Sequence, residues 1–412
     1  MSPASPAPAG ADAGPSALDA VTARASVVVC CGAGGVGKTT TAATIALHAA
    51  EQGRRACVVT VDPARRLADA LGLDRLSNEP TAVEGPWPGS LNAMMLDPKR
   101  TFDDLVTRYA DSPEQAQGIL ANRIYRNLTG ALSGTQEYMA MEKLYELVEE
   151  HDFDVVVVDT PPSRNALDFL DAPRRLTNFL GNRLFQVLMM PTRTSLRMMG
   201  VAAQALLRTL SKVAGADVVR DAVTFFQAFE GMEEGFRHRA ARMRELLTEA
   251  GTVFVVVASP RSESIEEAVH FTGKLTEAGM GVDALVVNRT LPRFLGAEDL
   301  ADLERLSAGG PGSDGADRVG GGAPSAGTTA PARSPNALGA LGALGALVRT
   351  VEGYAAAGAR EDDALDELVA AVAPAPVVRV PLLAGDVHDV AGLAELGSLL
   401  YTAANEGGRP AR

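Results

Sequence analysis

The sequence has few cysteines, no long hydrophobic run and fewer basic than acidic residues. Its 412 residues include only three cysteines, Cys30, Cys31 and Cys57, and no pair has C-x-x-C spacing. All three lie in or beside apolar segments typical of core strands, so we expect buried thiols rather than a disulfide or a metal site. The apolar runs are shorter than the roughly 18 residues that a membrane-spanning helix needs. We therefore expect no membrane-spanning segment.

The N-terminal segment indicates where the protein is located, and the charge balance indicates which partners it can bind. Residues 1–14 lack the basic and apolar zones of a signal peptide, which favours a cytoplasmic location. The chain has 38 basic and 51 acidic residues, a net charge of −13. Such an acidic chain is not typical of a general nucleic-acid-binding protein. We expect no nucleic-acid partner and only indirect contact with membranes.

A glycine-rich turn is the most specific motif in the chain. An apolar run at residues 27–30 leads into it, and a helix-forming stretch at residues 41–50 follows. Gly32 and Gly37 bracket four residues ahead of Lys38 and Thr39, which matches G-x-x-x-x-G-K-[ST]. The motif and its flanks indicate a phosphate-binding loop (P-loop), with an ordinary strand-to-helix turn as the alternative.

In a P-loop, backbone N–H groups turn inward to hold phosphate oxygens. We expect Lys38 to lie on the β- and γ-phosphates and the Thr39 hydroxyl to bind Mg²⁺, while the helix N-terminus adds partial positive charge. The predicted nucleotide-binding residues of the loop are Gly32, Gly34, Gly35, Val36, Gly37, Lys38, Thr39 and Thr40. The sequence thus predicts an α/β fold of the P-loop NTPase type, with a mostly parallel central sheet flanked by helices.

Two acidic residues follow predicted buried strands. Asp62 comes after the apolar residues 56–61, and Asp159 ends a strand that contains four consecutive valines. Ligands bind at the carboxyl ends of the strands in such sheets. We therefore expect Asp62 to orient the attacking water and Asp159 to bind Mg²⁺ through water. The alternatives are a helix N-cap for Asp62 and a turn residue for Asp159.

The remaining segments supply a helical region and a second set of strands. Residues 172–249 have a helical, methionine-rich pattern that indicates either core or a pliable binding surface. Residues 252–258, 282–288 and 377–380 have the pattern of strands. Asn288 ends one of them, and its amide can pair with a purine edge. The guanine selector N-K-x-D is missing, because Arg289 follows Asn288, so we expect adenine.

Taken together and in chain order, the P-loop, the segments D-P-A at 62–64 and D-T-P-P at 159–162, Asn288 and P-L-L at 381–383 resemble the arsenical pump-driving and tail-anchored-protein targeting ATPases. The resemblance covers most of residues 26–403. It implies that Asp62 lies in switch I and activates water, that Asp159 lies in switch II, and that Asn288, Pro381 and Leu382 hold adenine. It also implies ATP-closed dimers whose methionine-rich helical insert binds hydrophobic client helices.

The sequence departs from that family at several positions. Ala33 replaces a lysine that usually reaches across the dimer to the partner's nucleotide, and Ser163-Arg164 replaces the usual switch II glycine. We expect Arg164 or a partner subunit to supply the missing charge, and turnover to be low otherwise. The paired zinc cysteines of targeting ATPases and an arsenite thiol cluster are also missing.

We divide the chain by composition, periodicity and this resemblance. The predicted units are a disordered tail at 1–24, a first part of the ATPase core at 25–171, an inserted all-helical subdomain at 172–249, a second core part at 250–306, a low-complexity insertion at 307–336, a C-terminal core part with the adenine loop at 337–403, and a tail at 404–412. Leucines spaced by three at 338–347 favour a helix.

Three functions fit these features. The first is an ATPase with Mg²⁺ and ATP as cofactors, acting as a homodimer or as a heterodimer with a paralogue to control a client-binding surface. The second is a nucleotide-binding regulatory subunit with weak hydrolysis, which Ala33 favours. The third is a partition- or septum-positioning ATPase, although residues 405–412 show neither a basic surface nor an amphipathic helix.

Overall fold

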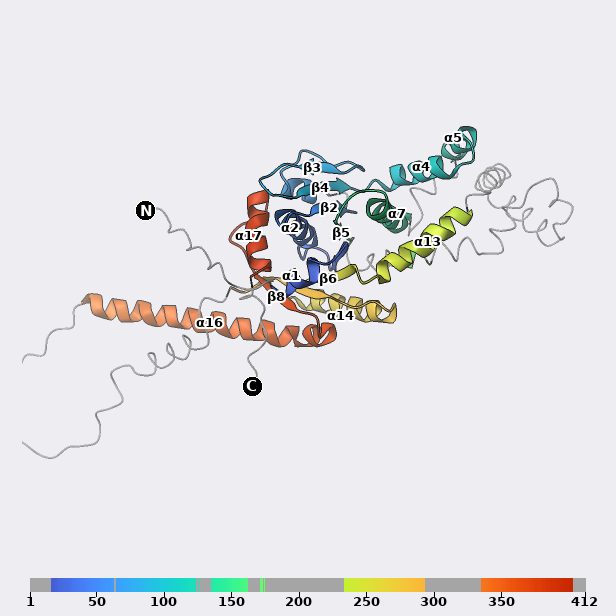
Figure 1. The fold of residues 1–412 in the computed structure, drawn as a ribbon. Coiled ribbons are helices and arrows are strands. Elements are labelled where there is room, and N and C mark those ends of the chain that lie inside the picture. Colours follow the sequence, from blue (N-terminus) through green and yellow to red (C-terminus); the bar gives the residue numbers. More distant parts are fainter. Residues whose placement is uncertain are drawn as a thin grey trace, which may run out of the picture.

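The computed structural model describes residues 16–62, 64–123, 125, 135–161, 171–172, 174, 233–292 and 335–402. The helices in these ranges are α1 (Ala17–Thr22), α2 (Lys38–Glu51), α3 (Arg66–Ala70), α4 (Pro98–Tyr109), α5 (Pro113–Ala121), α7 (Thr135–Glu149), α13 (Glu233–Thr248), α14 (Ser262–Glu277), α16 (Pro335–Val372) and α17 (Val390–Leu400). The strands are β1 (Val27–Gly32), β2 (Arg55–Thr60), β3 (Thr81–Val83), β4 (Ser90–Met95), β5 (Val155–Asp159), β6 (Thr252–Ala258), β7 (Ala284–Thr290) and β8 (Val377–Pro381). Figure 1 shows their arrangement.

One sheet joins the eight strands in the order β3-β4-β2-β5-β1-β6-β7-β8. Every neighbouring pair is parallel except β3 with β4 at the edge. β1, β5 and β6 are buried along their whole length, as expected for continuous apolar strands covered on both faces. The predicted fold, a mostly parallel sheet flanked by helices in the P-loop manner, is confirmed.

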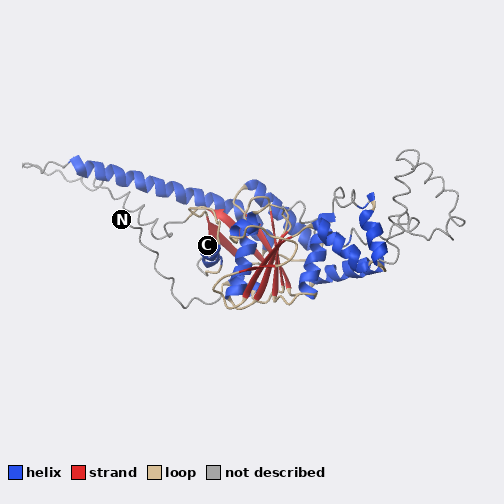
Figure 2. Ribbon diagram, turned by 90° about the horizontal axis from the view of Figure 1, so that it is seen from above, coloured by secondary structure: helices blue, strands red, loops and turns tan. Residues whose placement is uncertain are grey.

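Helices cover both faces of the sheet and build two cores (Figure 2). One core packs α2, α3 and α17 against one set of strand side chains, including Val28 and Val157. The other packs α7, α13, α14 and the end of α16 against the alternate set, including Val29 and Val158. Successive side chains of a strand point to opposite faces, so each central strand contributes to both cores.

The strand order changes direction at β1, as in other doubly wound sheets. Strands β2 to β5 lie on one side of β1, and β6 to β8 lie on the other. The crevice at the carboxyl ends of β1 and its neighbours is therefore the place where a doubly wound sheet binds ligands. Both the P-loop and the strand-end acids lie at this edge.

The N-terminal prediction needs correction. Residues 17–22 form α1, although the sequence placed them in a disordered tail. Ser16 caps α1 by accepting a hydrogen bond from the Asp19 N–H at 3.1 Å, and Leu18 is completely buried. Arg54 fixes the same segment, because its guanidinium donates to the carbonyl oxygens of Thr22 and Ala25. An apolar anchor and a cap stabilise this short helix despite the alanine- and proline-rich sequence around it.

Several further predictions have a structural outcome. The helix predicted for residues 338–347 exists and is part of α16, which also includes residues 335 and 336 of the predicted insertion. The three cysteines are buried free thiols, as expected, and burial raises the pKa of Cys31 and Cys57 to about 12. No helix of the described residues is long and apolar enough to span a membrane. Arg164 and most of the 172–249 insert lie outside the described residues.

Candidate functional site

The glycine-rich loop connects β1 to α2 and depends on two glycines for its shape. Gly32 has φ +149°, and a Cβ placed there would lie 2.0 Å from the Val257 carbonyl oxygen. Gly37 has φ +101°, and its Cβ would lie 2.3 Å from Nδ2 of Asn288. Only glycine tolerates both the positive φ and the close approach. The loop therefore wraps around the N-terminus of α2 in the manner predicted for a phosphate cradle.

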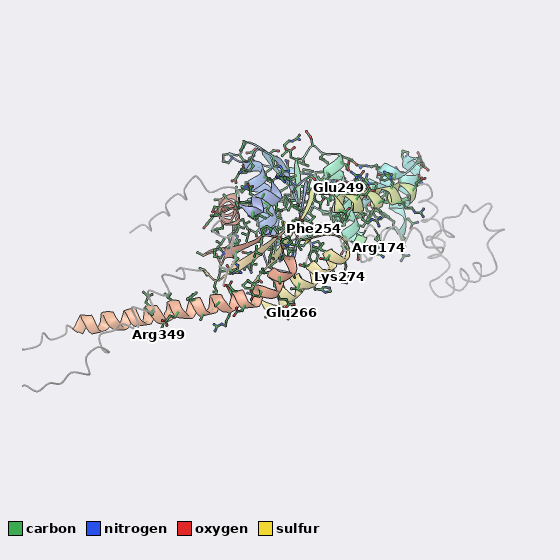
Figure 3. The ribbon with its side chains drawn as sticks, turned by 60° about the horizontal axis from the view of Figure 1, so that its bottom comes forward. Arg174, Glu249, Phe254, Glu266, Lys274 and Arg349 are labelled. Carbon is green, nitrogen blue, oxygen red and sulfur yellow. The ribbon has the colours of Figure 1, made fainter. Side chains whose placement is uncertain are left out.

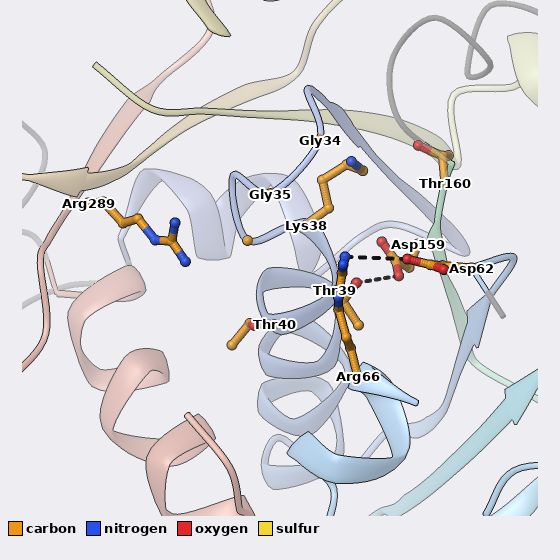
Figure 4. A pocket seen from close by; sticks show the side chains of 11 residues that line it. Gly34, Gly35, Lys38, Thr39, Thr40, Asp62, Arg66, Asp159, Thr160 and Arg289 are labelled. Carbon is orange, nitrogen blue, oxygen red and sulfur yellow. Dashed lines mark hydrogen bonds and ion pairs between the residues drawn. The ribbon is translucent and has the colours of Figure 1, made fainter. Parts of the chain in front are cut away.

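A cavity of about 390 Å³ opens on the outer side of this loop (Figure 4). The predicted residues that line it are Gly34, Gly35, Gly37, Lys38, Thr39, Thr40, Asp62 and Asp159. Thr160, Arg66 and Arg289 line it as well. Gly32 and Val36, which the sequence also nominated, lie behind the loop: Gly32 touches β6, and the Val36 side chain is buried. These two residues support the cradle rather than form its surface.

Lys38 is held inside the loop. Its Nζ donates hydrogen bonds to the carbonyl oxygens of Gly32 at 3.0 Å and Ala33 at 2.8 Å. The side chain is almost fully buried, and this desolvation lowers the pKa of the ammonium, while the Asp159 carboxylate opposes the shift. The positively charged Nζ therefore lies against the carbonyl oxygens of the loop, at the edge of the cavity.

Asp159 is buried at the end of β5 and only half of its carboxylate is satisfied. Oδ2 accepts hydrogen bonds from the hydroxyls of Thr39 at 2.7 Å and Thr60 at 2.8 Å. Oδ1 is buried and has no hydrogen-bond partner among the described residues. Burial raises the pKa of Asp159, and the two hydroxyls oppose that rise. An unpartnered buried oxygen of this kind indicates that a further ligand or water belongs beside it.

These side chains fit a Mg²⁺ site of the P-loop type. Within the described ranges, no three His, Cys, Asp or Glu side chains gather where they could hold a metal. A metal ion at this edge would therefore depend on a hydroxyl, water molecules and substrate oxygens, which is how Mg²⁺ is usually bound beside phosphates. The Thr39 hydroxyl and the free Oδ1 of Asp159 are the donors that suit it.

Asp62 follows the end of β2 and faces the same cavity. Its Oδ1 accepts the Ala64 N–H at 2.9 Å, and its Oδ2 lies 3.4 Å from the guanidinium of Arg66 on α3. The carboxylate is therefore only lightly held and about a third exposed. Register places Thr60 directly opposite Asp159, so the ends of β2 and β5 bring both acids to one cavity, as predicted from the strand ends.

A second cavity, of about 380 Å³, adjoins the first. Asn288, Pro381 and Leu382, the residues predicted to hold adenine, all line it, and the Leu382 side chain is largely exposed. The Asn288 amide already secures the loop, since its Nδ2 donates to the Val36 carbonyl oxygen at 2.8 Å. The structure thus brings the predicted base-binding residues together next to the loop.

The structure also shows the surroundings of Ala33 and brings unpredicted residues to the site. Ala33 is 5% exposed and belongs to a core, so position 33 offers no cation to the cavity or to a partner. Four residues at the site, Thr60, Arg66, Thr160 and Arg289, were not predicted from the sequence. The register of β2 against β5 identifies Thr60, and a strand irregularity identifies Arg289; both are tertiary features. In the sequence, the only indication that Thr60 or Arg289 could lie at the site was that each is near the end of a predicted strand.

The fold and the site together define a P-loop ATPase. The model of the anion-transporting ATPase family matches residues 25–299, and the chain belongs to this family. It is 28% identical to ATPase GET3 of Malassezia globosa over 68% of this chain and 78% of that protein. It is also 32% identical to the uncharacterized protein SCO2128 of Streptomyces coelicolor over 63% of this chain and 61% of that one, and 26% identical to ATPase get3 of Aspergillus terreus over 63% and 72%.

Proposed function

We propose that this ATPase couples Mg²⁺-dependent ATP hydrolysis to the opening and closing of a dimer, and that the cycle controls a helical surface for a hydrophobic client segment. The supporting observation is the half-satisfied Asp159 carboxylate beside Thr39, at the same cavity as Lys38 and Asp62. This is the combination that hydrolysis of a γ-phosphate requires: a phosphate cradle, a metal-side acid and a free carboxylate.

Each residue has a separate task in this proposal. Lys38 releases the loop carbonyl oxygens and donates to the β- and γ-phosphate oxygens, and the loop N–H groups hold the phosphate chain. Thr39 and Asp159 would hold Mg²⁺, Asp159 through water, and the bound ion would offset the negative charge of the phosphates. Asp62 accepts a hydrogen bond from the attacking water and orients it in line with the leaving oxygen.

The helices on one side of the sheet connect this chemistry to a partner surface. α4, α5, α7 and α13 lie together beyond one face of the sheet (Figure 1). α7 leads through a short turn into β5, which ends at Asp159, and α13 leads into β6 next to β1. A change at Asp159 on hydrolysis therefore has a short route to these helices. Relatives named ATPase GET3 and the family resemblance support the dimer and the hydrophobic client.

The proposal can be tested by measuring the mass of the protein in solution and its binding of a model client peptide. We expect a non-hydrolysable ATP analogue with Mg²⁺ to raise the solution mass to that of a dimer, and ADP to lower it. A fluorescent apolar helical peptide should bind in a nucleotide-dependent way, whereas a polar helix of equal length should not. The Lys38→Ala variant should show neither response. Peptide binding that is identical with ATP, with ADP and in Lys38→Ala would contradict the proposal.

A further inference from the structure

Arg289 has an unusual backbone conformation next to the nucleotide cavity. Its φ is +63°, and it is the one non-glycine residue with positive φ in the part of the chain that the structure describes. A left-handed conformation disfavours a side chain with a Cβ, and such positions concentrate at functional sites. Glycine would adopt it at lower cost. The presence of an arginine at this position therefore calls for a role of its side chain.

The strand geometry explains how this side chain is directed. β7 pairs with β8 through Asn288 with Val380 and through Thr290 with Pro381, which leaves Arg289 as an extra, unpaired residue. Such a bulge turns a side chain away from its regular strand direction. The Asn288 side chain stabilises the bulge, since its Oδ1 accepts the Arg289 N–H at 2.9 Å while its Nδ2 donates to the P-loop.

Arg289 stands between the two cavities of the site. Gly37, Thr40, Arg66 and Arg289 line both the loop cavity and the cavity of Pro381. A nucleotide with its terminal phosphates in the first cavity and its base in the second must pass between these four residues. The part of ATP that passes there is the inner end of the phosphate chain with the ribose. In Figure 4 the Arg289 side chain points from its strand toward the loop at Gly35.

The other cations of the cavity already have partners. Lys38 donates to two loop carbonyl oxygens, and Arg66 pairs with Asp62. Arg289 is exposed, and among the described residues no acceptor engages its guanidinium. Its planar fork of five N–H donors suits a phosphate better than a single ammonium group does. Position 33 cannot supply this charge, because alanine has no charged group.

We propose that Arg289 is a nucleotide-binding residue whose guanidinium binds the phosphate chain of ATP at its ribose end, supplied from within the same subunit. The bulge and the positive φ at residue 289 exist to present this side chain. The proposal depends on the nucleotide occupying both cavities, and it concerns phosphate binding rather than the client or the dimer.

The test compares nucleotides that differ in phosphate. By titration calorimetry, Arg289→Ala should bind ATP and ADP about 10- to 100-fold more weakly than the unmodified protein and bind adenosine equally well. Arg289→Lys should recover part of the loss, since it keeps the charge without the fork. Added salt should narrow the difference between Arg289→Ala and the unmodified protein. Arg349→Ala, far out on α16 (Figure 3), is the matched control and should bind every nucleotide normally.

Arg289→Gly separates binding from folding. Glycine accepts φ +63° without strain, so this variant should melt at the same temperature as the unmodified protein or higher, and should lose ATP affinity as Arg289→Ala does. Unchanged ATP affinity in Arg289→Ala and Arg289→Gly would overturn the inference, and so would an equal loss of adenosine binding, which would assign Arg289 to the base. If the unmodified protein itself fails to bind ATP, the proposed function fails with it.

Discussion

At the residue scale, we expect the buried Lys38 of the P-loop to contribute more to nucleotide binding than to stability. Lys38 donates its hydrogen bonds to the loop carbonyl oxygens; in the proposed function, phosphate oxygens replace these acceptors. The same burial that lowers the pKa of its ammonium removes competing water, so a phosphate bound there would meet the charge in a low-dielectric site. Removing this charge should affect the nucleotide far more than the fold.

We expect Lys38→Ala to reduce ATP turnover by at least about 100-fold, because a cation at the transferred phosphate contributes several kcal/mol to the transition state. The free energy of unfolding without nucleotide should change by no more than about 1 kcal/mol, since the variant loses two hydrogen bonds but also a buried charge. Steady-state kinetics and urea unfolding measure the two effects. Normal turnover in a folded Lys38→Ala would contradict the assigned role.

Thr60 is a positioning residue for Asp159. Its hydroxyl donates to Oδ2 at 2.8 Å and leaves Oδ1 free to face the cavity. We expect Thr60→Val to raise the Mg²⁺ concentration needed for half-maximal ATPase activity by about 10-fold, because partners that orient a ligand typically contribute 10- to 100-fold to metal affinity. Thr60→Ser keeps the hydroxyl and should behave normally. Equal Mg²⁺ dependence in both variants would show that the hydroxyl has only a structural role.

Asp154 provides a pH-dependent contribution away from the site. It accepts hydrogen bonds from the Arg55 N–H and the Arg55 guanidinium, which lower the pKa of its carboxyl to about 2. A lowered pKa adds stability above the ordinary value, and the contribution is lost as pH falls through the lowered pKa. The carboxylate is partly exposed, so we expect Asp154→Asn to cost only about 0.5–1 kcal/mol at pH 7. Urea unfolding at pH 7, 3.5 and 2 should show this difference mostly retained at pH 3.5 and largely lost at pH 2. A difference that stays constant down to pH 2 would contradict the assignment.

At the scale of elements, the strands were predictable and the exceptions have physical reasons. Apolar runs bounded by polar residues identify β1, β5 and β6, because these strands are buried on both faces. β3 was missed because it has three residues and is only partly buried. α1 was missed because a helix of six residues has too few turns to show a period.

Some residues of the candidate site could be predicted from local sequence, and others depend on the tertiary structure. The P-loop and the strand-end acids follow from local sequence, so Lys38, Thr39 and Asp159 could be nominated. Thr60 and Arg289 depend on strand register and on a bulge, and no local pattern encodes either one. The sequence does not show that Arg289 has a left-handed backbone conformation, in which glycine would be less strained; this becomes apparent only from its φ in the structure.

α1 should contribute to the stability of the whole sheet. Leu18 is completely buried in the core formed by α2 and α17, and Arg54 ties the same segment to the strand ends. We expect Leu18→Ala to lower the free energy of unfolding by about 2–4 kcal/mol, the usual cost of a buried leucine. Arg24→Ala, an exposed neighbour, is the control and should cost less than about 0.5 kcal/mol. Thermal and urea unfolding would test this, and equal effects would contradict the docking of α1.

At the scale of the molecule, the sheet with its covering helices carries the candidate site, and the first turns of α16 project from this body. The buried residues near the end of α16, Leu365, Leu368 and Val372, anchor it to the core of α14. Its earlier turns project from the body, and Leu347 and Tyr354 are exposed there (Figures 1 and 3). Glu361 accepts the Leu291 N–H at 2.9 Å just past the carboxyl end of β7, so these turns of α16 leave the body at the sheet edge that carries the two cavities.

ATP binding should be linked to the stability of the folded protein. Lys38, Asp62 and Asp159 come from three different elements that meet at the cavity, and the base cavity adds β7 and β8. A ligand that bridges them binds the folded state alone and should stabilise it by about 2.7 kcal/mol at 100 times its dissociation constant. Differential scanning calorimetry with ATP and Mg²⁺ should therefore show a melting temperature that rises with ATP concentration. Adenosine at equal concentration should give a smaller rise and Lys38→Ala little or none; an ATP-induced rise that persists in full in Lys38→Ala would place the nucleotide outside the P-loop.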